Sequence, residues 1–288
     1  MSWRTVIISS NAKLDYQMGY LVIRSQETRK VYINEIATLI VESTAVSMTS
    51  YLLCELMKNK VKVIFCDEKR NPSSELLPYY GSHDTSMKIR SQLRWDDSTK
   101  RIIWTEIVRD KIKKQATLLE KRGVAANNLL ETYQEEVTIG DVTNREGHAA
   151  KVYFNALFGK SFSRSEDCPI NAALNYGYSI ILSLFNREIV SNGYITQIGI
   201  FHDNMFNQFN LASDFMEPFR PLIDEIVLDM ELPLFEKEQK YQILEVLQNE
   251  IRIDGRLEYL PNAIKIYTRS LLDALNERDI SLIKFYSV

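Results

Sequence analysis

A glutamate interrupts the apolar side of a helical pattern near the middle of the chain. Over residues 142–158 the apolar side chains recur at helical spacing, and Glu146 falls in the centre of the side that holds Ala149, Tyr153 and Leu157. An ionised carboxylate on such a face is costly to bury unless a cation pairs with it. Two explanations stay open: Glu146 forms a structural pair with a buried cation, or it is a functional carboxylate.

Two later segments carry residues that could act with Glu146. Residues 197–209 form a polar and aromatic connection that bears His202, and the amphipathic pattern over 211–227 carries Asp214 and Glu217 on its polar flank. Each feature alone is more typical of a structural residue, since acids near a helix N-terminus favour the helix dipole. A glutamate, a histidine and a second acid together form a mixed donor set, which suits Mg²⁺ or Mn²⁺ better than structural zinc.

Other catalytic schemes find little support. The chain contains no GxSxG, GxxxxGK[ST] or HExxH motif, and no GxGxxG follows a predicted strand. The three cysteines, Cys54, Cys66 and Cys168, form no CxxC pair, so neither a disulfide framework nor a cysteine zinc site is indicated.

Charge is distributed unevenly along the 288 residues. The net charge is −3, but residues 88–122 hold eleven Lys and Arg against five Asp and Glu, whereas residues 214–258 hold twelve acidic against five basic residues. A solvated helix face with ion pairs is the more common explanation of such a basic run. The alternative is a surface that binds phosphate groups.

The termini and the apolar segments bear on location. The opening MSWRTVIISS has no basic region followed by an apolar one, and no uncharged apolar run approaches the ~20 residues that span a bilayer. We therefore expect a soluble, cytoplasmic protein without a membrane partner.

The order of the elements that must position these residues predicts an α+β protein. Short β-branched runs such as TVIISS, YLVIRS, KVYIN, ATLIVES and VKVIFCD fill the first 67 residues, with turn-prone NAKLD between the first two. A helix with Ser47 or Thr49 as N-cap precedes the last run, and EKRNPSSELLPYYGSHD is typical of a linker. We predict a β-rich domain over 1–75, a linker over 76–86 and an α-helical domain over 87–288.

Strand patterns are nearly absent from the larger part of the chain, apart from a brief YITQIGIF. Apolar residues recur there with a period of 3.6, and glycines follow most of the segments. The predicted helices cover residues 87–122, 124–136, 142–158, 170–191, 208–229, 235–250 and 259–277.

Four segments, in this order, resemble motifs of the CRISPR-associated integrase, the larger of the two universal spacer-acquisition proteins of CRISPR–Cas systems. The segments are NREGHAAKVYF (144–154), NAALNYGYSIIL (171–182), IGIFH (198–202) and SDFMEPFRP (213–221). The opening MSWRTVIIS and the overall length are most similar to the forms associated with type II systems.

The resemblance implies a catalytic metal site formed by Glu146, His202 and Glu217, with Mg²⁺ or Mn²⁺ as the ion. Many relatives have aspartate at the position of Glu217, and glutamate supplies the same oxygen donor on a longer side chain. Asp214 matches a commonly acidic position and is interpreted as a neighbour of the site that does not bind the metal.

The resemblance also implies an activity and an assembly. The 3′-hydroxyl of a double-stranded DNA fragment would attack a phosphodiester at the edge of a CRISPR repeat, and the same site would hydrolyse DNA as an endonuclease. The chain would form homodimers through its N-terminal domain, and a dimer of the small second adaptation protein would bridge two such homodimers. The predicted DNA surface comprises Arg90, Arg94, Lys111, Lys113 and Lys114.

Two alternatives remain. In one, the protein is a non-catalytic DNA-binding scaffold in which Glu146 is a structural ion-pair partner, so that losing Glu146 would strand a buried cation. In the other, the acidic helices form an interaction module with no nucleic-acid role, and salt-dependent DNA binding would exclude it.

Overall fold

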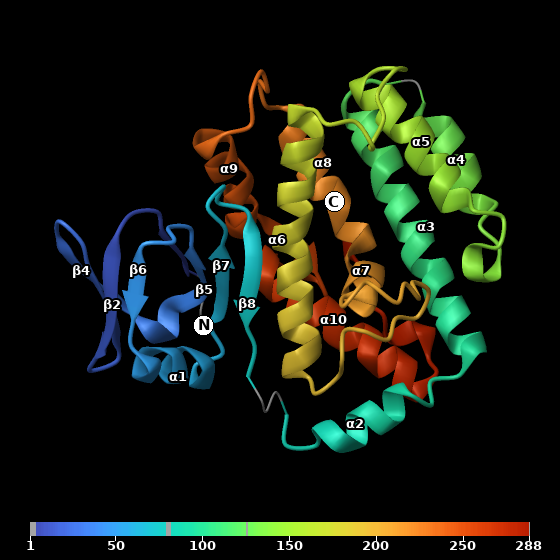
Figure 1. Ribbon diagram of the computed structural model, residues 1–288. Coiled ribbons are helices and arrows are strands. Elements are labelled where there is room, and N and C mark those ends of the chain that lie inside the picture. The colour runs from blue at the N-terminus through green and yellow to red at the C-terminus, as the bar shows by residue number, and fades with distance from the viewer. Residues whose placement is uncertain (1–3, 79–81, 125, 288) are drawn as a thin grey trace. The chain divides into compact units, whose positions relative to one another are not determined.

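The chain is divided into two compact units in a computed structural model that describes residues 4–78, 82–124 and 126–287 (Figure 1). One unit comprises residues 1–79 and the other residues 80–288, so the division falls inside the predicted linker, 76–86. Each unit has its own core.

The first unit consists of two four-stranded sheets and one helix. One sheet has the order β1-β5-β7-β8 and the other β4-β3-β2-β6. All six residues of β5 are buried and it pairs in parallel with both neighbours, which explains why Thr38 is the only polar residue in its sequence IATLIV. The elements are β1 (Arg4–Ile8), β2 (Ala12–Gln17), β3 (Tyr20–Arg24), β4 (Thr28–Tyr32), η1 (Ile33–Glu35), β5 (Ile36–Val41), β6 (Val46–Met48), α1 (Ser50–Lys58), β7 (Lys62–Cys66) and β8 (Pro72–Leu76).

The sequence pattern identified five of these strands and missed β2, β6 and β8. The segment NAKLD, predicted as a turn, lies largely in β2, where Leu14 is fully buried and pairs with Ile23 of β3. Its alanine, lysine and aspartate have low strand propensity, so cross-strand pairing outweighs local preference here. Thr49 caps α1, as one of the two predicted alternatives, and accepts a hydrogen bond from the Leu52 amide at 3.3 Å.

The second unit is mostly helical, which confirms the β-then-α order of the α+β prediction. It also contains a three-stranded sheet of order β10-β9-β11, so it is not all-α as predicted. Its helices are α2 (Thr85–Gln92), α3 (Asp97–Lys121), α4 (Asn127–Glu135), η2 (Ile139–Asp141), α5 (Arg145–Phe158), α6 (Pro169–Ser191), α7 (Asn210–Met216), η3 (Glu217–Phe219), α8 (Arg220–Leu228), α9 (Lys237–Leu244), η4 (Glu245–Gln248), α10 (Leu260–Glu277) and η5 (Ile280–Leu282), and its strands are β9 (Glu250–Ile253), β10 (Arg256–Tyr259) and β11 (Tyr286–Ser287).

The predicted helix over 87–122 is in fact two helices. Asp96 ends the connection between them, and its carboxylate accepts hydrogen bonds from the amides of Ser98 and Thr99 at 3.0 and 3.1 Å. These bonds satisfy free N–H groups of the first turn of α3. The segment YITQIGIF forms no strand, because its backbone bonds to buried polar side chains such as Gln92 instead.

Helix α3 is the element on which the site depends. It packs against α5, η3, α8 and α10, and Figure 1 shows it, in green, among these elements of the second unit. Thirteen of its 25 residues are buried, which is why its sequence shows so little one-sided amphipathicity. Over the described residues, no helix combines the length and the apolar character needed to cross a membrane.

Candidate functional site

Two of the three predicted site residues meet at one lysine of α3. The ammonium group of Lys111 donates hydrogen bonds to a carboxylate oxygen of Glu146 and, at 2.5 Å, to Oε2 of Glu217. The Lys111 side chain is 7% exposed, so water screens these charges poorly. Burial would lower the pKa of Lys111, but the negative charges of Glu217 and Glu146 outweigh burial and raise it. The lysine is therefore a permanent cation between two carboxylates.

Local hydrogen bonds fix Glu146 in the first turn of α5. The carboxylate of Asp141 accepts from the amides of Arg145 and Glu146 at 2.8 and 3.0 Å, and Asn144, with a φ of 53°, caps the helix through the Gly147 amide. This position lets the helix dipole stabilise the glutamate's negative charge. The glutamate side chain is 29% exposed, so Glu146 faces an opening and not the core.

Glu217 lies in the short helix η3 and contacts the same ammonium group of Lys111. Its Oε1 accepts a hydrogen bond from Nε of Arg220 at 3.0 Å, a pair one helical turn apart. Burial would raise the pKa of Glu217, but the charges of Arg220 and Lys111 outweigh it and lower the pKa to about 2. Glu217 is therefore ionised at every pH at which the protein would work.

His202 lies beside these residues and is oriented by Asp214. The fully buried carboxylate of Asp214 accepts hydrogen bonds from the amides of residues 200, 201 and 202 and contacts Nδ1 of His202 at 2.5 Å. The hydrogen bond to Asp214 raises the pKa of His202. Because Nδ1 is engaged, Nε2 is the ring nitrogen left for a ligand or a proton.

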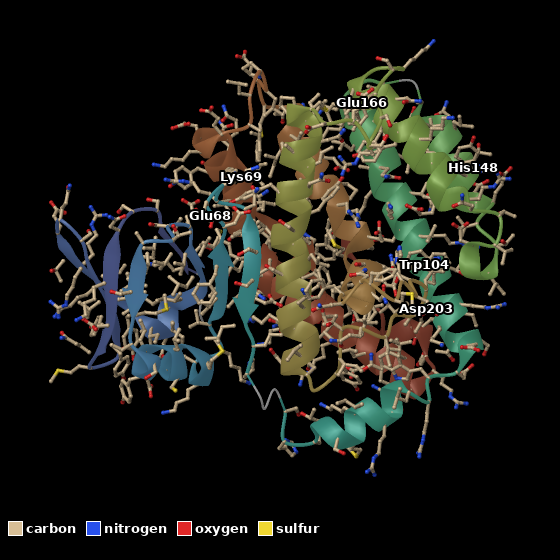
Figure 2. All side chains as sticks on the ribbon, viewed as in Figure 1. Glu68, Lys69, Trp104, His148, Glu166 and Asp203 are labelled. Carbon is tan, nitrogen blue, oxygen red and sulfur yellow. The ribbon has the colours of Figure 1, made fainter. Side chains whose placement is uncertain are left out.

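Aromatic packing completes the environment of His202. Phe201 stacks on Trp104 of α3 with ring centroids 4.2 Å apart, and the His202 ring meets Trp104 edge-on at 5.7 Å. Figure 2 labels Trp104 together with Asp203, the residue that follows the histidine. The histidine loop is thus anchored to the same helix that carries Lys111.

A cavity of about 180 Å³ opens at the two glutamates and is lined also by Lys111, Arg164, Tyr178 and Arg220. At its wall Asp224 accepts hydrogen bonds from the hydroxyls of Tyr153, at 2.9 Å, and Tyr178. Burial raises the pKa of Asp224 to about 6. The cavity therefore has the mixture of positive and negative groups expected where charged groups react.

The structure brings Glu146 and Glu217 together, whereas His202 stands with Asp214 next to them. Within residues 4–78, 82–124 and 126–287, no three His, Cys, Asp or Glu side chains converge as a metal cluster. Two carboxylates that share one cation nevertheless form the oxygen-rich environment that Mg²⁺ or Mn²⁺ prefers. As metal ligands and catalytic residues, the three remain predictions, as does the neighbouring role of Asp214.

The predicted DNA-binding set needs a correction. Lys111 and Lys114 are 5% and 4% exposed and cannot belong to a surface. Lys114 pairs with Asp110 and lies over the Tyr286 ring at 3.7 Å, because α3 buries this side against α10 and the C-terminal segment. Arg90, Arg94 and Lys113 are exposed, and their role in DNA binding stays a prediction.

Several residues of the site were not anticipated from the sequence. Arg220 could have been found, because it follows Glu217 by three residues within a helical pattern. Lys111 and Asp224 gave no signal for this site, since their partners Glu146 and Tyr153 lie 35 and 71 residues away in the chain. Arg164 was not anticipated either, although its partners Asn171 and Asn175 follow it by 7 and 11 residues. His148 lies on the exposed side of α5, as Figure 2 shows, and takes no part in the cavity.

Comparisons with known proteins relate the chain to one protein family. The family model described as CRISPR associated protein Cas1 matches residues 5–239. The CRISPR-associated endonuclease Cas1 of Neisseria meningitidis serogroup C is 37% identical over 233 residues, which are 80% of this chain and 76% of that protein.

Two solved structures share the fold. A casposase bound to integration product has a TM-score of 0.77 at 18% identity, covering 96% of this chain and 91% of that one. A chain of a Cas6-RT-Cas1–Cas2 complex has a TM-score of 0.72 at 18% identity, covering 97% of this chain and 36% of that one. The matched family model and the meningococcal relative together show that this chain belongs to the CRISPR-associated Cas1 family.

Proposed function

We propose that the protein is a metal-dependent DNA integrase and endonuclease of CRISPR adaptation, which joins the 3′-hydroxyl ends of a DNA fragment to a CRISPR repeat by transesterification. Family membership supports the reaction class, because the meningococcal relative is named an endonuclease. The observation that carries the proposal is the convergence of Glu146 and Glu217 on a single cation, Lys111.

In this proposal Glu146, Glu217 and His202 hold Mg²⁺ or Mn²⁺, which would polarise the scissile phosphate and lower the pKa of the attacking hydroxyl. Arg220 keeps Glu217 ionised and oriented. Asp214 holds Nδ1 of His202, so that Nε2 is directed to a ligand or accepts a proton. No protein nucleophile is required, since the DNA hydroxyl is itself the attacking group.

The DNA surface proposed here is smaller than the basic run of the sequence. Arg90 lies in α2 and Arg94 in the turn that follows it, and both line a cavity of about 720 Å³ with Arg278, between α2 and the end of α10. Lys113 is exposed on α3. These side chains can neutralise phosphates of a duplex without reading its sequence.

We propose a homodimer as the working unit, paired through the β-rich unit, with two dimers bridged by a dimer of the second adaptation protein. Insertion of both ends of a fragment requires two sites, which a symmetric assembly provides. The complex that includes Cas1 and Cas2 supports the identity of this partner by analogy of fold. The assignment to the type II form is part of the same proposal.

The test is incorporation of a labelled double-stranded fragment into a supercoiled plasmid that carries a CRISPR repeat, with the second adaptation protein and Mn²⁺ or Mg²⁺. Glu146→Ala should abolish joining while leaving DNA binding in EDTA in place. Unchanged joining by this variant would overturn the site assignment. Absence of joining and of DNA binding by the unsubstituted protein would overturn the function.

A second candidate function is a non-catalytic DNA-binding scaffold. Its support is that Lys111 is buried and already neutralised by Glu146 and Glu217, as a purely structural ion cluster would be. The two candidates predict different responses of the unfolding free energy to Mn²⁺: a metal site is stabilised by the ion and a structural ion cluster is not.

A further inference from the structure

Arg164 is the cation of the cavity whose charge remains unneutralised. Lys111 pairs with Glu146 and Glu217, and Arg220 pairs with Glu217. Among the residues that the structure describes, Arg164 forms no ion pair with a carboxylate. Its partners are the neutral carbonyl oxygens of Asn171 and of Asn175, the latter at 2.7 Å. An arginine lining a polar cavity without a counter-ion is a site at which an anion gains energy.

The guanidinium group is held in one orientation. Asn171 is 3% exposed, and its Nδ2 donates to the backbone carbonyls of residues 163 and 166 at 2.8 Å each. These bonds orient the Asn171 amide so that its oxygen faces Arg164. The guanidinium carbon also lies 5.6 Å from the ring centre of Phe154 and 5.4 Å from that of Tyr178. The side chain has therefore lost its flexibility before any ligand binds, which lowers the entropic cost of binding.

Tyr178 connects Arg164 with the catalytic carboxylates. The ring lies 4.6 Å from the guanidinium carbon of Arg220, and its hydroxyl donates to the buried Asp224. The two arginines thus approach one tyrosine ring beside Glu217. A guanidinium group presents its donors in a planar fork that matches two oxygens of a phosphate, so charge and shape agree.

We propose that Arg164 binds a backbone phosphate of the DNA strand that reacts in this cavity. Its role is to hold that strand against Glu146 and Glu217, and Asn171 and Asn175 position its guanidinium group. This inference rests on the proposed function, because it takes DNA as the anion.

The test compares Arg164→Gln and Arg164→Lys with Arg269→Gln, which removes one exposed positive charge of α10 outside the cavity. Binding of fluorescent DNA with a single-stranded 3′ end is measured by anisotropy in EDTA at several salt concentrations. We expect Arg164→Gln to weaken binding by about 10-fold and to reduce the salt slope by about one counter-ion. Arg164→Lys keeps the charge and should restore the salt slope but not the full affinity. Arg269→Gln should change neither quantity.

Joining with Mn²⁺ at saturating DNA provides a second measurement, and thermal melts establish that each variant is folded. Arg164→Gln should join DNA about 10-fold more slowly even when all sites are filled, because the strand is no longer held at the carboxylates. If it binds and joins DNA like the unsubstituted protein, the inference is wrong and the proposed function stands. If the unsubstituted protein neither binds nor joins DNA, the proposed function itself fails.

Discussion

Replacement of Lys111 by methionine distinguishes a metal site from a structural ion cluster. Methionine has a similar length but no charge, so the variant leaves two carboxylates facing each other. Oxygens of Glu146 and Glu217 that share one ammonium lie no more than ~5 Å apart, and at an effective dielectric constant of ~20 their repulsion is about 3 kcal/mol.

The expected loss of stability is smaller than that of an isolated buried charge. Breaking a fully buried pair costs ~3–5 kcal/mol. Glu146 is 29% exposed and partly screened, and Glu217 keeps Arg220 at 3.0 Å. We therefore expect Lys111→Met to lower the free energy of unfolding by ~2–4 kcal/mol in EDTA. Glu146→Gln leaves Lys111 paired with Glu217 and should cost ~1 kcal/mol or less.

The assay is urea unfolding of the unsubstituted protein, Lys111→Met and the double variant Lys111→Met/Glu146→Gln, each with EDTA and with Mn²⁺. A metal held by the two carboxylates at 100 times its dissociation constant would stabilise Lys111→Met by ~2.7 kcal/mol. The unsubstituted protein should gain less, because Lys111 competes for the same oxygens. The double variant should be more stable than Lys111→Met in EDTA and respond little to Mn²⁺. An unchanged unfolding free energy of Lys111→Met in Mn²⁺ would refute the metal assignment and favour a structural ion cluster.

Three further variants probe the supports of the site. Burial raises the pKa of Asp224 from 3.8 to about 6, so the folded state binds the proton of this carboxyl more tightly than the unfolded state, and stability falls as the pH rises from about 4 to about 6. Asp224→Asn lacks this titration, so its unfolding free energy should rise relative to that of the unsubstituted protein by up to ~3 kcal/mol over this pH range. A difference that does not change with pH would contradict the burial argument. Gly177→Ala would place a Cβ 2.4 Å from Cγ2 of Ile223 and should lower the unfolding free energy by ~1–3 kcal/mol in chemical denaturation. The decrease should be smaller when Ile223 is also replaced by alanine, and an equal decrease with and without Ile223→Ala would exclude this contact as the cause. Asp214→Asn places an amide N–H donor against the backbone N–H groups of residues 200–202, so it should lower the unfolding free energy by ~1–3 kcal/mol in thermal melts and slow DNA joining. A normal rate of joining would show that the orientation of His202 is not needed.

The sequence predicted that strands precede helices along the chain, but not every strand and helix boundary. Long helices such as α10 carry a strong apolar period, so their existence followed from the pattern. Strands β2, β6 and β8 were missed because pairing with β3, β2 and β7, respectively, stabilises them, and local propensity does not report strand pairing. The same limit explains the sheet β10-β9-β11, whose β11 lies at the end of the chain.

The site was predictable in its residue types and not in its counter-charges. Glu146 stood out because an acid interrupted an apolar pattern, and the structure shows what it faces. Its partner Lys111 lay hidden in a basic run, where a buried lysine looks like an exposed one. Only the packing of α3 against α5 and η3 separates Lys111 from the exposed Lys113 two residues later. The difference between the two lysines is their burial, which depends on the packing of the whole fold and not on the local sequence.

The motif NYGY illustrates how one short segment supports the chemistry without performing it. Asn175 accepts a hydrogen bond from Arg164, and Tyr178 donates one to Asp224. Gly177 leaves no room for a side chain between α6 and Ile223 of α8. Gly177 and Tyr178 therefore determine how closely α6 packs against α8, the helix that carries Arg220 at its start. Since Arg220 keeps Glu217 ionised, a change in this motif would reach the carboxylates through packing alone.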